Sequence, residues 1–306
     1  MAGKDNGMKG ARMKETNAGG RSFRFSMAMS PFPSVFAPLV FAGKLDEGMR
    51  ALAKADFQGV EISLRSADDL EPDWLKKTLD ELHLSISAFA TGRMCLEESY
   101  CLCDPRQDHR DKSQERLMEI IRMAASFHAP VIIGGVRGKL NGDPLQKDLQ
   151  RSMAIGILQG CANLASELGT HLLLEPINRY ETNIMNSAQD ALDLAEEIDR
   201  PGVKILLDTF HMNIEEVDIA ETIRRVGKNL GYMHFADSNR LAPGQGHINF
   251  LEIMQTLAEI HYSGFICAEI LPLPDDTTAL NLTGQYLHHL VNEPASQKNI
   301  ERSQHV

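Results

Sequence analysis

The segment His171-Leu-Leu-Leu-Glu175 is a short apolar run of β-strand type that ends in a carboxylate, and its pattern returns three times further along the chain. The later copies are Val203-Lys-Ile-Leu-Leu-Asp208, Tyr232-Met-His234 and Phe265-Ile-Cys-Ala-Glu269. Helix-type segments separate these runs. Carboxylates and an imidazole that arrive from different strands are the ligands that an oxygen-rich divalent metal site requires.

The same alternation of strand and helix extends over most of the chain. Short apolar or β-branched runs predict eight strands, at residues 23–29, 60–64, 84–89, 131–135, 171–175, 203–208, 231–236 and 265–270. Amphipathic stretches predict eight helices, at residues 45–56, 72–82, 109–127, 145–168, 187–198, 215–226, 250–261 and 277–291. Near-continuous apolar strands separated by helices favour a parallel sheet that is covered on both faces.

Eight strand–helix units indicate an α/β protein with the (β/α)₈ or TIM-barrel fold, whose typical length of about 250 residues fits this chain of 306 residues. An open doubly wound sheet usually has fewer strands and a Gly-rich first turn, whereas Ser30-Pro-Phe-Pro33 follows the first strand here. We therefore expect a single catalytic barrel over residues 23–293. The active sites of such barrels lie at the carboxyl ends of the strands, where the four candidate ligands occur.

The rest of the composition restricts the class of protein. Residues 1–22 lack an apolar stretch, which predicts a disordered tail rather than a secretory signal, and a second tail is expected at residues 294–306. No apolar run reaches membrane-spanning length. The formal net charge of −11, without a cluster of basic residues, argues against a nucleic-acid partner. A small-molecule substrate is the better expectation.

The five cysteines are odd in number and show no paired spacing, so we expect reduced thiols in a cytoplasmic protein. They are Cys95, Cys101, Cys103, Cys161 and Cys267. Cys101 and Cys103 are separated by one leucine. Such a pair could bind a metal ion, but two incidental loop cysteines explain the spacing as well.

The predicted metal ligands are Glu175, Asp208, His234 and Glu269. A helix cap, a paired core charge or a hydrogen-bonded core histidine would explain any one of them alone. Together, however, three carboxylates at one barrel mouth would repel strongly without a cation. Three oxygen donors and one nitrogen favour Mn²⁺, Co²⁺ or Mg²⁺ over a structural zinc, which prefers sulfur and more imidazole, and a zinc site stays open as an alternative.

The order of the ligands around the barrel suggests a reaction. Strands five and eight lie about 135° apart in a ring of eight, so Glu175 and Glu269 can face a bound substrate from opposite sides. The metal would polarise a carbonyl and its adjacent hydroxyl and stabilise an enediolate. One glutamate would remove the proton next to the carbonyl, and the other would return it from the opposite face. The expected outcome is epimerisation at that carbon.

Three residues near these ligands are candidates for substrate binding. Glu181 could contact substrate hydroxyls or form a salt bridge with Arg179. His211 lies one turn beyond a ligand and could reach a bound carbonyl oxygen or cap the following helix. Arg240 supplies a fixed positive charge suited to an enediolate oxygen, unless it is a solvated loop arginine.

Further candidates come from the first half of the chain. Arg65 follows the second strand and Arg137 follows the fourth, and paired arginines at the mouth would favour a substrate with a carboxylate or phosphate. Ordinary pairing with loop acids is the alternative. Glu61 is expected to orient another mouth residue or to form a buried ion pair. Residues 93–108 form a long irregular insert that could close as a lid or only cover the surface. His247 fits a structural role better than a catalytic one.

The chain resembles the ketose 3-epimerases of the D-tagatose/D-allulose type, which belong to the xylose-isomerase-like barrel superfamily. The resemblance runs from about Phe23 to Leu290. It rests on the motifs Glu175-Pro-Ile-Asn-Arg-Tyr-Glu181, Asp208-Thr-Phe-His-Met-Asn-Ile-Glu-Glu216, His234-Phe-Ala-Asp-Ser-Asn-Arg240, Pro243-Gly-Gln-Gly-His247 and Ala268-Glu-Ile270. The family implies an isomerase with Mn²⁺ or a similar ion on Glu175, Asp208, His234 and Glu269. It also implies Glu175 and Glu269 as the proton-transfer pair, with the substrate held by Glu181, His211 and Arg240.

The first half is similar to one branch, the bacterial 5-keto-L-gluconate epimerases. The motifs are Ser30-Pro-Phe-Pro-Ser34, Glu61-Ile-Ser-Leu-Arg65 and Ile133-Gly-Gly-Val-Arg-Gly138. That branch implies a substrate carboxylate, which Arg65 and Arg137 would suit, and the family implies a homodimer or homotetramer.

Other activities of this barrel superfamily stay open or are disfavoured. Aldose–ketose isomerisation shares the enediolate and stays open. So does C-glycoside cleavage by metal-dependent lyases, which have a small β-rich partner subunit. The repair endonucleases use a zinc cluster with more histidines, which this ligand set does not match.

Overall fold

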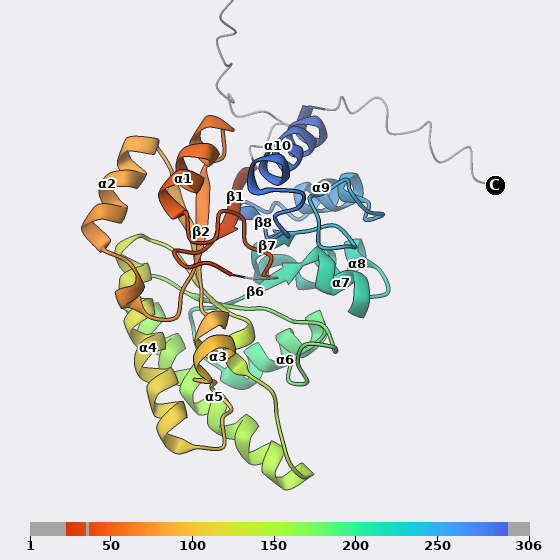
Figure 1. Cartoon of the computed structure of the whole chain (residues 1–306). Coiled ribbons are helices and arrows are strands. Elements are labelled where there is room, and N and C mark those ends of the chain that lie inside the picture. Colours follow the sequence, from red (N-terminus) through yellow and green to blue (C-terminus); the bar gives the residue numbers. More distant parts are fainter. Residues whose placement is uncertain (1–22, 35–36, 293–306) are drawn as a thin grey trace, which may run out of the picture.

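The computed structural model describes residues 23–34 and 37–292, and its eight parallel strands form a closed barrel in chain order (Figure 1). The strands are β1 (Arg24–Met29), β2 (Gly59–Ser63), β3 (Ser85–Ala90), β4 (Val131–Ile133), β5 (Leu172–Leu174), β6 (Val203–Asp208), β7 (Leu230–Phe235) and β8 (Phe265–Ala268). The pairing of β8 with β1, which sets Arg24 beside Phe265, closes the ring. The predicted (β/α)₈ fold is confirmed.

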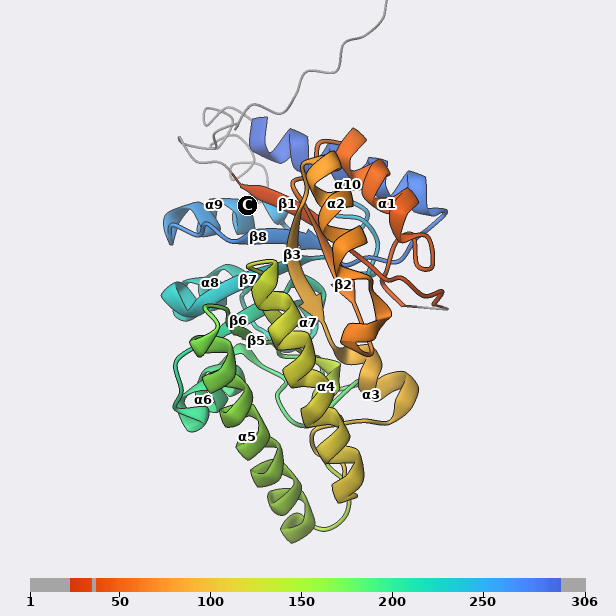
Figure 2. The ribbon, with the colours of Figure 1, turned by 90° about the vertical axis from the view of Figure 1, so that its left-hand side faces the viewer.

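Helices cover the outside of the barrel, and α4 and α5 lie side by side along one flank (Figure 2). The helices are α1 (Leu45–Lys54), α2 (Pro72–Leu82), α3 (Gly92–Glu98), α4 (Gln107–Ser126), α5 (Pro144–Glu167), α6 (Ala188–Ile198), α7 (Thr209–Glu215), α8 (Ile219–Val226), α9 (Phe250–Glu259) and α10 (Asp276–Asn292). None of the helices in the described residues combines the length and apolar character needed to cross a membrane. The tails expected at 1–22 and 294–306 lie outside those residues.

Two details of the helix prediction are wrong. The single helix expected at residues 215–226 is divided between α7 and α8, because Asp218 begins a new helix by accepting a hydrogen bond from the Glu221 backbone N–H. The insert at residues 93–108 is not irregular throughout, since it contains most of α3 and the start of α4.

The cysteine prediction is also wrong in part. A disulfide joins Cys95 in α3 to Cys101 in the loop that follows. Two thiols six residues apart form this bond because the turn after α3 brings their Cα atoms to 4.6 Å. Cys103, Cys161 and Cys267 are free and buried. The cytoplasmic location, which was inferred from reduced thiols, therefore loses one of its supports and stays a prediction.

The interior of the barrel is filled by inward-facing side chains from several strands. Leu173 of β5, Leu206 of β6, Tyr232 of β7 and Cys267 of β8 pack there together with smaller side chains from β1 and β3. The alternate residues on these strands face outward and join the large core between the sheet and the helices. This alternation follows from the two-residue repeat of a β-strand.

Candidate active site

Four side chains from β5 to β8 meet at the carboxyl ends of the strands. One donor atom from each of Glu175, Asp208, His234 and Glu269 lies within 4.8 Å of the others. His234 Nδ1 is 3.4 Å from Glu175 Oε1 and 3.4 Å from Glu269 Oε2. It is 3.6 Å from Asp208 Oδ2. The structure thus brings together the four residues that the sequence predicts as metal ligands.

The two-residue repeat of the strands explains why the four candidate ligands meet. Each of the four ligands lies two positions beyond one of the inward-facing residues Leu173, Leu206, Tyr232 and Cys267. Side chains two positions apart on a strand share a face, so each ligand also points toward the barrel axis. The four ligands form the layer directly above the side chains that fill the barrel.

The chemistry of this cluster fits a divalent cation. His234 Nδ1 is buried and has no hydrogen-bond partner, although three carboxylates surround it. Three clustered carboxylates repel unless positive charge lies among them. Carboxylate oxygens with one imidazole nitrogen suit Mn²⁺, Mg²⁺ or Co²⁺. Glu175, Asp208, His234 and Glu269 are the residues that would hold the ion.

Burial and neighbouring charges shift the pKa values of this cluster. Burial raises the pKa of Asp208, but Arg240 and the nearby histidines outweigh it and hold this pKa below its ordinary value. Burial also raises the pKa of Glu269, and His234 and Arg240 bring it below the ordinary value. Burial lowers the pKa of His234, but Glu61 and Glu269 raise it well above the ordinary value. In the absence of a cation the imidazole therefore carries a proton that a metal ion must displace.

Arg240 bridges two of the ligands. Its guanidinium donates to Asp208 Oδ2 at 2.7 Å and to Glu269 Oε2, and it stacks over the ring of Phe210. The residue adopts a left-handed backbone, with φ of 62°, in the loop after β7. Arg240 is thus a largely buried, ion-paired cation rather than a solvated loop arginine, since its side chain is 11% exposed.

A chain of hydrogen bonds connects the other two predicted substrate residues. The Asn178 side-chain amide is 2.8 Å from Glu181 Oε1 and 2.8 Å from His211 Nδ1. His211 lies within α7 and does not cap the following helix α8, because Asp218 does so through the Glu221 backbone N–H. Arg179 pairs with Glu215 and leaves Glu181 free of the salt bridge considered from the sequence. Asn178 itself was not predicted, although it lies within the Glu175–Glu181 motif.

A cavity of about 690 Å³ opens above the four ligands. Glu181, His211 and Arg240 line it together with Glu175, His234 and Glu269. Its wall also contains Lys139, which the sequence did not indicate, and Tyr180, which lies within the Glu175–Glu181 motif but was not singled out. The segment predicted as a possible lid contributes Cys95, Cys101 and Asp104, so it borders the cavity, and closure of this segment stays a prediction.

The expected pair of arginines at the mouth is not found among the residues that line the cavity. Arg137 is fully buried, where its guanidinium donates to the backbone carbonyls of Ile133 and Glu175, and burial lowers its pKa to about 10. Arg65 pairs with Asp69 and stacks on the ring of Phe32. Neither guanidinium lines the cavity, because each has structural partners elsewhere, and substrate contact by Arg65 or Arg137 stays a prediction.

Glu61 and His247 can also be placed. Glu61 Oε2 lies 2.8 Å from His234 Nε2, so Glu61 contacts a mouth residue, and the same contact is a buried ion pair when the imidazole is protonated. His247 Nδ1 lies 2.9 Å from the Ser238 hydroxyl in an exposed loop, in agreement with a structural role.

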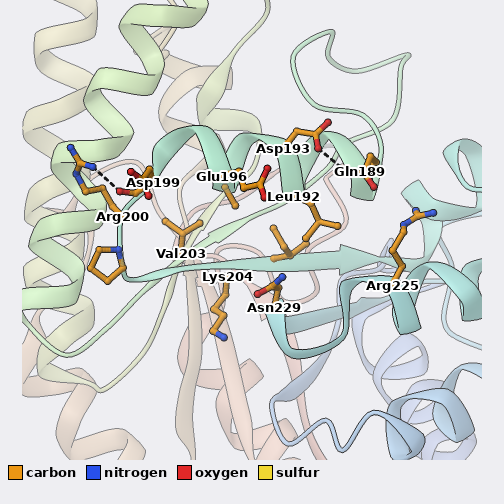
Figure 3. Close-up of a pocket in the computed structure, with 13 residues that line it drawn as sticks. Gln189, Leu192, Asp193, Glu196, Asp199, Arg200, Val203, Lys204, Arg225 and Asn229 are labelled. Atoms are coloured by element: carbon orange, nitrogen blue, oxygen red, sulfur yellow. Dashed lines mark hydrogen bonds between the residues drawn. The ribbon is translucent and has the colours of Figure 1, made fainter.

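A separate hollow lies on the outside of the barrel, between α6 and the start of β6 (Figure 3). Asp193 and Glu196 project from the helix there, and Lys204 projects from the strand. Asp208 ends β6, so this hollow lies at the opposite end of the strand from the ligands. Within the described residues, no metal-ligating cluster is found at this hollow.

The comparisons with known proteins agree with this geometry. The sequence model of the xylose isomerase-like TIM barrel family matches residues 49–281. The ketose 3-epimerase of Arthrobacter globiformis is 30% identical over 242 residues, which cover 76% of this chain and 81% of that protein. The D-psicose 3-epimerase of Enterocloster bolteae is 43% identical over 118 residues, and the chain spans 39% of the length of that relative. The crystal structure of D-allulose 3-epimerase from Methylomonas sp. superposes with a TM-score of 0.75 at 22% identity, covering 88% of this chain and 98% of that one.

The chain therefore belongs to the xylose isomerase-like TIM barrel family, and within it to the ketose 3-epimerases. This membership confirms the resemblance drawn from the motifs of its second half.

Proposed function

We propose that the protein is a metal-dependent epimerase that inverts the carbon next to the carbonyl of a ketose or a keto-sugar acid. The observation that carries this proposal is the position of Glu175 and Glu269. They come from β5 and β8, and each lies 3.4 Å from the same nitrogen, His234 Nδ1, below the cavity. Two carboxylates on different sides of one bound carbon are what a proton removal and return with inversion require.

Each residue of the site has a role in this reaction. One of Glu175 and Glu269 takes the proton from the carbon, and the other holds a proton and delivers it to the opposite face. Arg240 stabilises the negative charge that develops on the enediolate oxygen, because its guanidinium lies within the carboxylate cluster. Glu181 and His211 orient the substrate hydroxyls, and Asn178 fixes both side chains.

Glu175, Asp208, His234 and Glu269 would hold a divalent ion, which we propose to be Mn²⁺, and it would supply Lewis-acid polarisation of the substrate carbonyl and its adjacent hydroxyl. Mg²⁺ and Co²⁺ suit the same donor set, so a comparison of the metals under equal conditions would identify the preferred ion.

A keto-sugar acid such as 5-keto-L-gluconate is one proposed substrate, and a neutral ketose is the other. With Arg65 and Arg137 outside the cavity, Lys139 is the lysine of its wall that could meet a substrate carboxylate. If it does so, Lys139→Met should raise KM for the keto-sugar acid about tenfold and leave KM for D-fructose or D-tagatose unchanged. An equal change for both substrates would remove the carboxylate from the proposal.

Assembly as a homodimer or homotetramer, and a cytoplasmic location, are also proposed.

Turnover in deuterated water tests the reaction itself. A panel of ketoses and 5-keto-gluconate with added Mn²⁺ should give one deuterium at the inverted carbon. Glu175→Gln and Glu269→Gln should each lower kcat at least about 100-fold, because general acid–base catalysis contributes about 10²–10⁴. Glu167→Gln, at the end of α5 and exposed, is the matched control. Normal turnover in either site variant would refute the proton-transfer roles.

The same experiment separates the alternatives. An aldose product with deuterium at C1 or C2 would identify an aldose–ketose isomerase. Cleavage of a C-glycoside, together with co-purification of a small β-rich protein, would identify a lyase subunit.

A further inference from the structure

A fourth buried carboxylate lies directly below the candidate metal site. Glu61 is the third residue of β2 and points into the barrel, and it is fully buried. Its Oε2 is 2.8 Å from Nε2 of His234, which belongs to β7. The hydrogen bond therefore joins two strands that are not neighbours in the sheet.

The two nitrogens of the His234 ring have different surroundings. Nε2 faces Glu61, whereas Nδ1 faces Glu175, Asp208 and Glu269 at 3.4–3.6 Å and has no hydrogen-bond partner. An ionised carboxylate accepts a hydrogen bond and cannot donate one, so opposite an ionised Glu61 the Nε2 position carries the ring proton. A neutral imidazole with its proton on Nε2 has its lone pair on Nδ1, toward the three carboxylates.

We propose that Glu61 is a positioning residue, which fixes the tautomer and the ring plane of His234 so that Nδ1 is presented to the metal ion. This inference rests on the metal dependence stated under the proposed function. A ligand histidine in other metal sites commonly donates its second N–H to a carboxylate or carbonyl, and such a partner also raises the basicity of the ligand.

The energetic cost of Glu61 supports a functional role. A buried ion pair inside a barrel is often no more stable than apolar side chains of the same volume. Oε1 of Glu61 is itself buried without a hydrogen-bond partner. Glu61 therefore makes a single hydrogen bond, and its partner is the ligand histidine His234.

A neighbouring side chain offers a matched control. Tyr232 lies in the same strand as His234, is buried in the barrel interior, and contacts the histidine ring edge-on with centroids 5.5 Å apart. Its hydroxyl donates to Ser87 and lies 3.3 Å from the Ser26 hydroxyl rather than contacting either nitrogen of His234. Tyr232→Phe therefore disturbs the polar interior of the barrel without removing the hydrogen bond at Nε2.

The test is a titration of the metal-free full chain with Mn²⁺, in which the free ion is measured by electron paramagnetic resonance. Glu61→Gln keeps the shape of the side chain but replaces the charged acceptor by an amide, and it should raise the Kd for Mn²⁺ about 10–100-fold. At saturating Mn²⁺, KM for the ketose should stay within about twofold of the wild-type value. Tyr232→Phe should leave the Kd within about threefold. A Kd unchanged in Glu61→Gln, or an equal loss in Tyr232→Phe, overturns the proposal.

Two further readouts keep the outcome interpretable. If Glu61→Gln does not fold, Glu61→Asp retains the charge but shortens the side chain, and it should weaken Mn²⁺ binding while a Tyr232→Phe chain does not. The second readout is the nitrogen-15 spectrum of the histidines in protein that is loaded with diamagnetic Mg²⁺. The wild type should carry the His234 proton on Nε2, and Glu61→Gln should show a mixture of tautomers. A wild-type proton on Nδ1 overturns the proposal. A wild type that binds Mn²⁺ but epimerises no sugar refutes only the proposed function.

Discussion

The substitution Gly134→Ala is expected to displace the Glu175 carboxylate without unfolding the barrel. Gly134 lies directly after β4, and a Cβ atom there would be 2.1 Å from Glu175 Oε2 and 3.2 Å from its Cδ. Ordinary contact begins at about 3.4 Å, so the oxygen must retreat from 2.1 Å to 3.4 Å, or about 1.3 Å. Metal–ligand distances tolerate only about ±0.2 Å.

A shift of this size should be visible in the rate. Misplacement of a catalytic group by about 1 Å costs about 100-fold, which corresponds to about 2.7 kcal/mol of barrier height. We therefore expect kcat of Gly134→Ala to fall about 100-fold in a ketose epimerisation assay at saturating Mn²⁺. The melting temperature should change little, because the displaced atoms are the far end of a flexible side chain that borders the cavity.

The next residue provides the control. A Cβ at Gly135 would meet only Gly92, at 3.5 Å from its Cα, which is ordinary contact. Gly135→Ala makes the same chemical change in the same turn and should keep activity within about threefold of the wild type. The reasoning is refuted if Gly134→Ala is as active as Gly135→Ala, or if both lose activity together with thermal stability.

Three other perturbations test separate parts of the molecule. Mn²⁺ binding at pH 7 should release about one proton, because burial lowers the pKa of His234 but the surrounding carboxylates raise it further, well above its ordinary value. Below that pKa the ring is protonated, so the affinity for Mn²⁺ should fall as the pH falls. Calorimetry in buffers of different ionisation enthalpy measures both the proton release and the affinity. A heat of Mn²⁺ binding that does not depend on the buffer contradicts the proton release. Arg137→Met should cost about 1–3 kcal/mol of stability, measured by denaturant unfolding, because two backbone carbonyls lose a charged donor. It should not change the preference between ketose and keto-sugar acid, and a selective loss of keto-acid turnover would return Arg137 to the substrate site. Reduction of the Cys95–Cys101 disulfide should cost about 2 kcal/mol of stability and raise KM, because both cysteines line the cavity. The double variant Cys95→Ala/Cys101→Ala is the control and should be insensitive to the reductant. If the reductant leaves the KM of the wild type unchanged, the disulfide has no part in substrate binding.

The strand pattern was sufficient to predict which four side chains meet at the rim of the barrel. In a closed parallel barrel every strand runs in the same direction, so residues that end successive strands meet at one rim. The predicted strand at residues 203–208 and the predicted helix at 72–82 agree with β6 and α2. For Glu175, Asp208, His234 and Glu269 the two-residue repeat also fixes the direction of the side chain, because each follows an inward-facing residue by two positions.

Long side chains in loops could not be placed in the same way. Arg137 follows a strand as the ligands do, but a short 3₁₀ turn at Gly135–Arg137 directs its guanidinium back toward the carbonyls of Ile133 and Glu175. Arg65 is held by Asp69, four residues further on, and by the ring of Phe32 from another loop. These partners depend on the shape of the loops, and two of them, Phe32 and Glu175, are distant in the sequence, so strand periodicity carries no information about them. The Cys95–Cys101 disulfide was missed for a related reason, since it depends on the tight turn that ends α3.

The balance of charge at the site explains why this set of side chains suits proton transfer with a divalent ion. With both glutamates ionised, before one of them takes up the proton that it delivers, the ligand layer carries three negative charges on Glu175, Asp208 and Glu269, and Arg240 compensates one of them. Glu61 lies below this layer, where its charge acts on the other face of His234. A divalent ion beside a neutral His234 compensates the other two, whereas a monovalent ion would leave one charge uncompensated in a poorly solvated cluster. When one glutamate takes a proton from the substrate, the negative charge passes from that glutamate to the enediolate, and the total stays constant. The protein therefore does not have to solvate an additional charge at the transition state. The fixed Arg240 guanidinium can stabilise the negative charge as it passes from the glutamate to the enediolate.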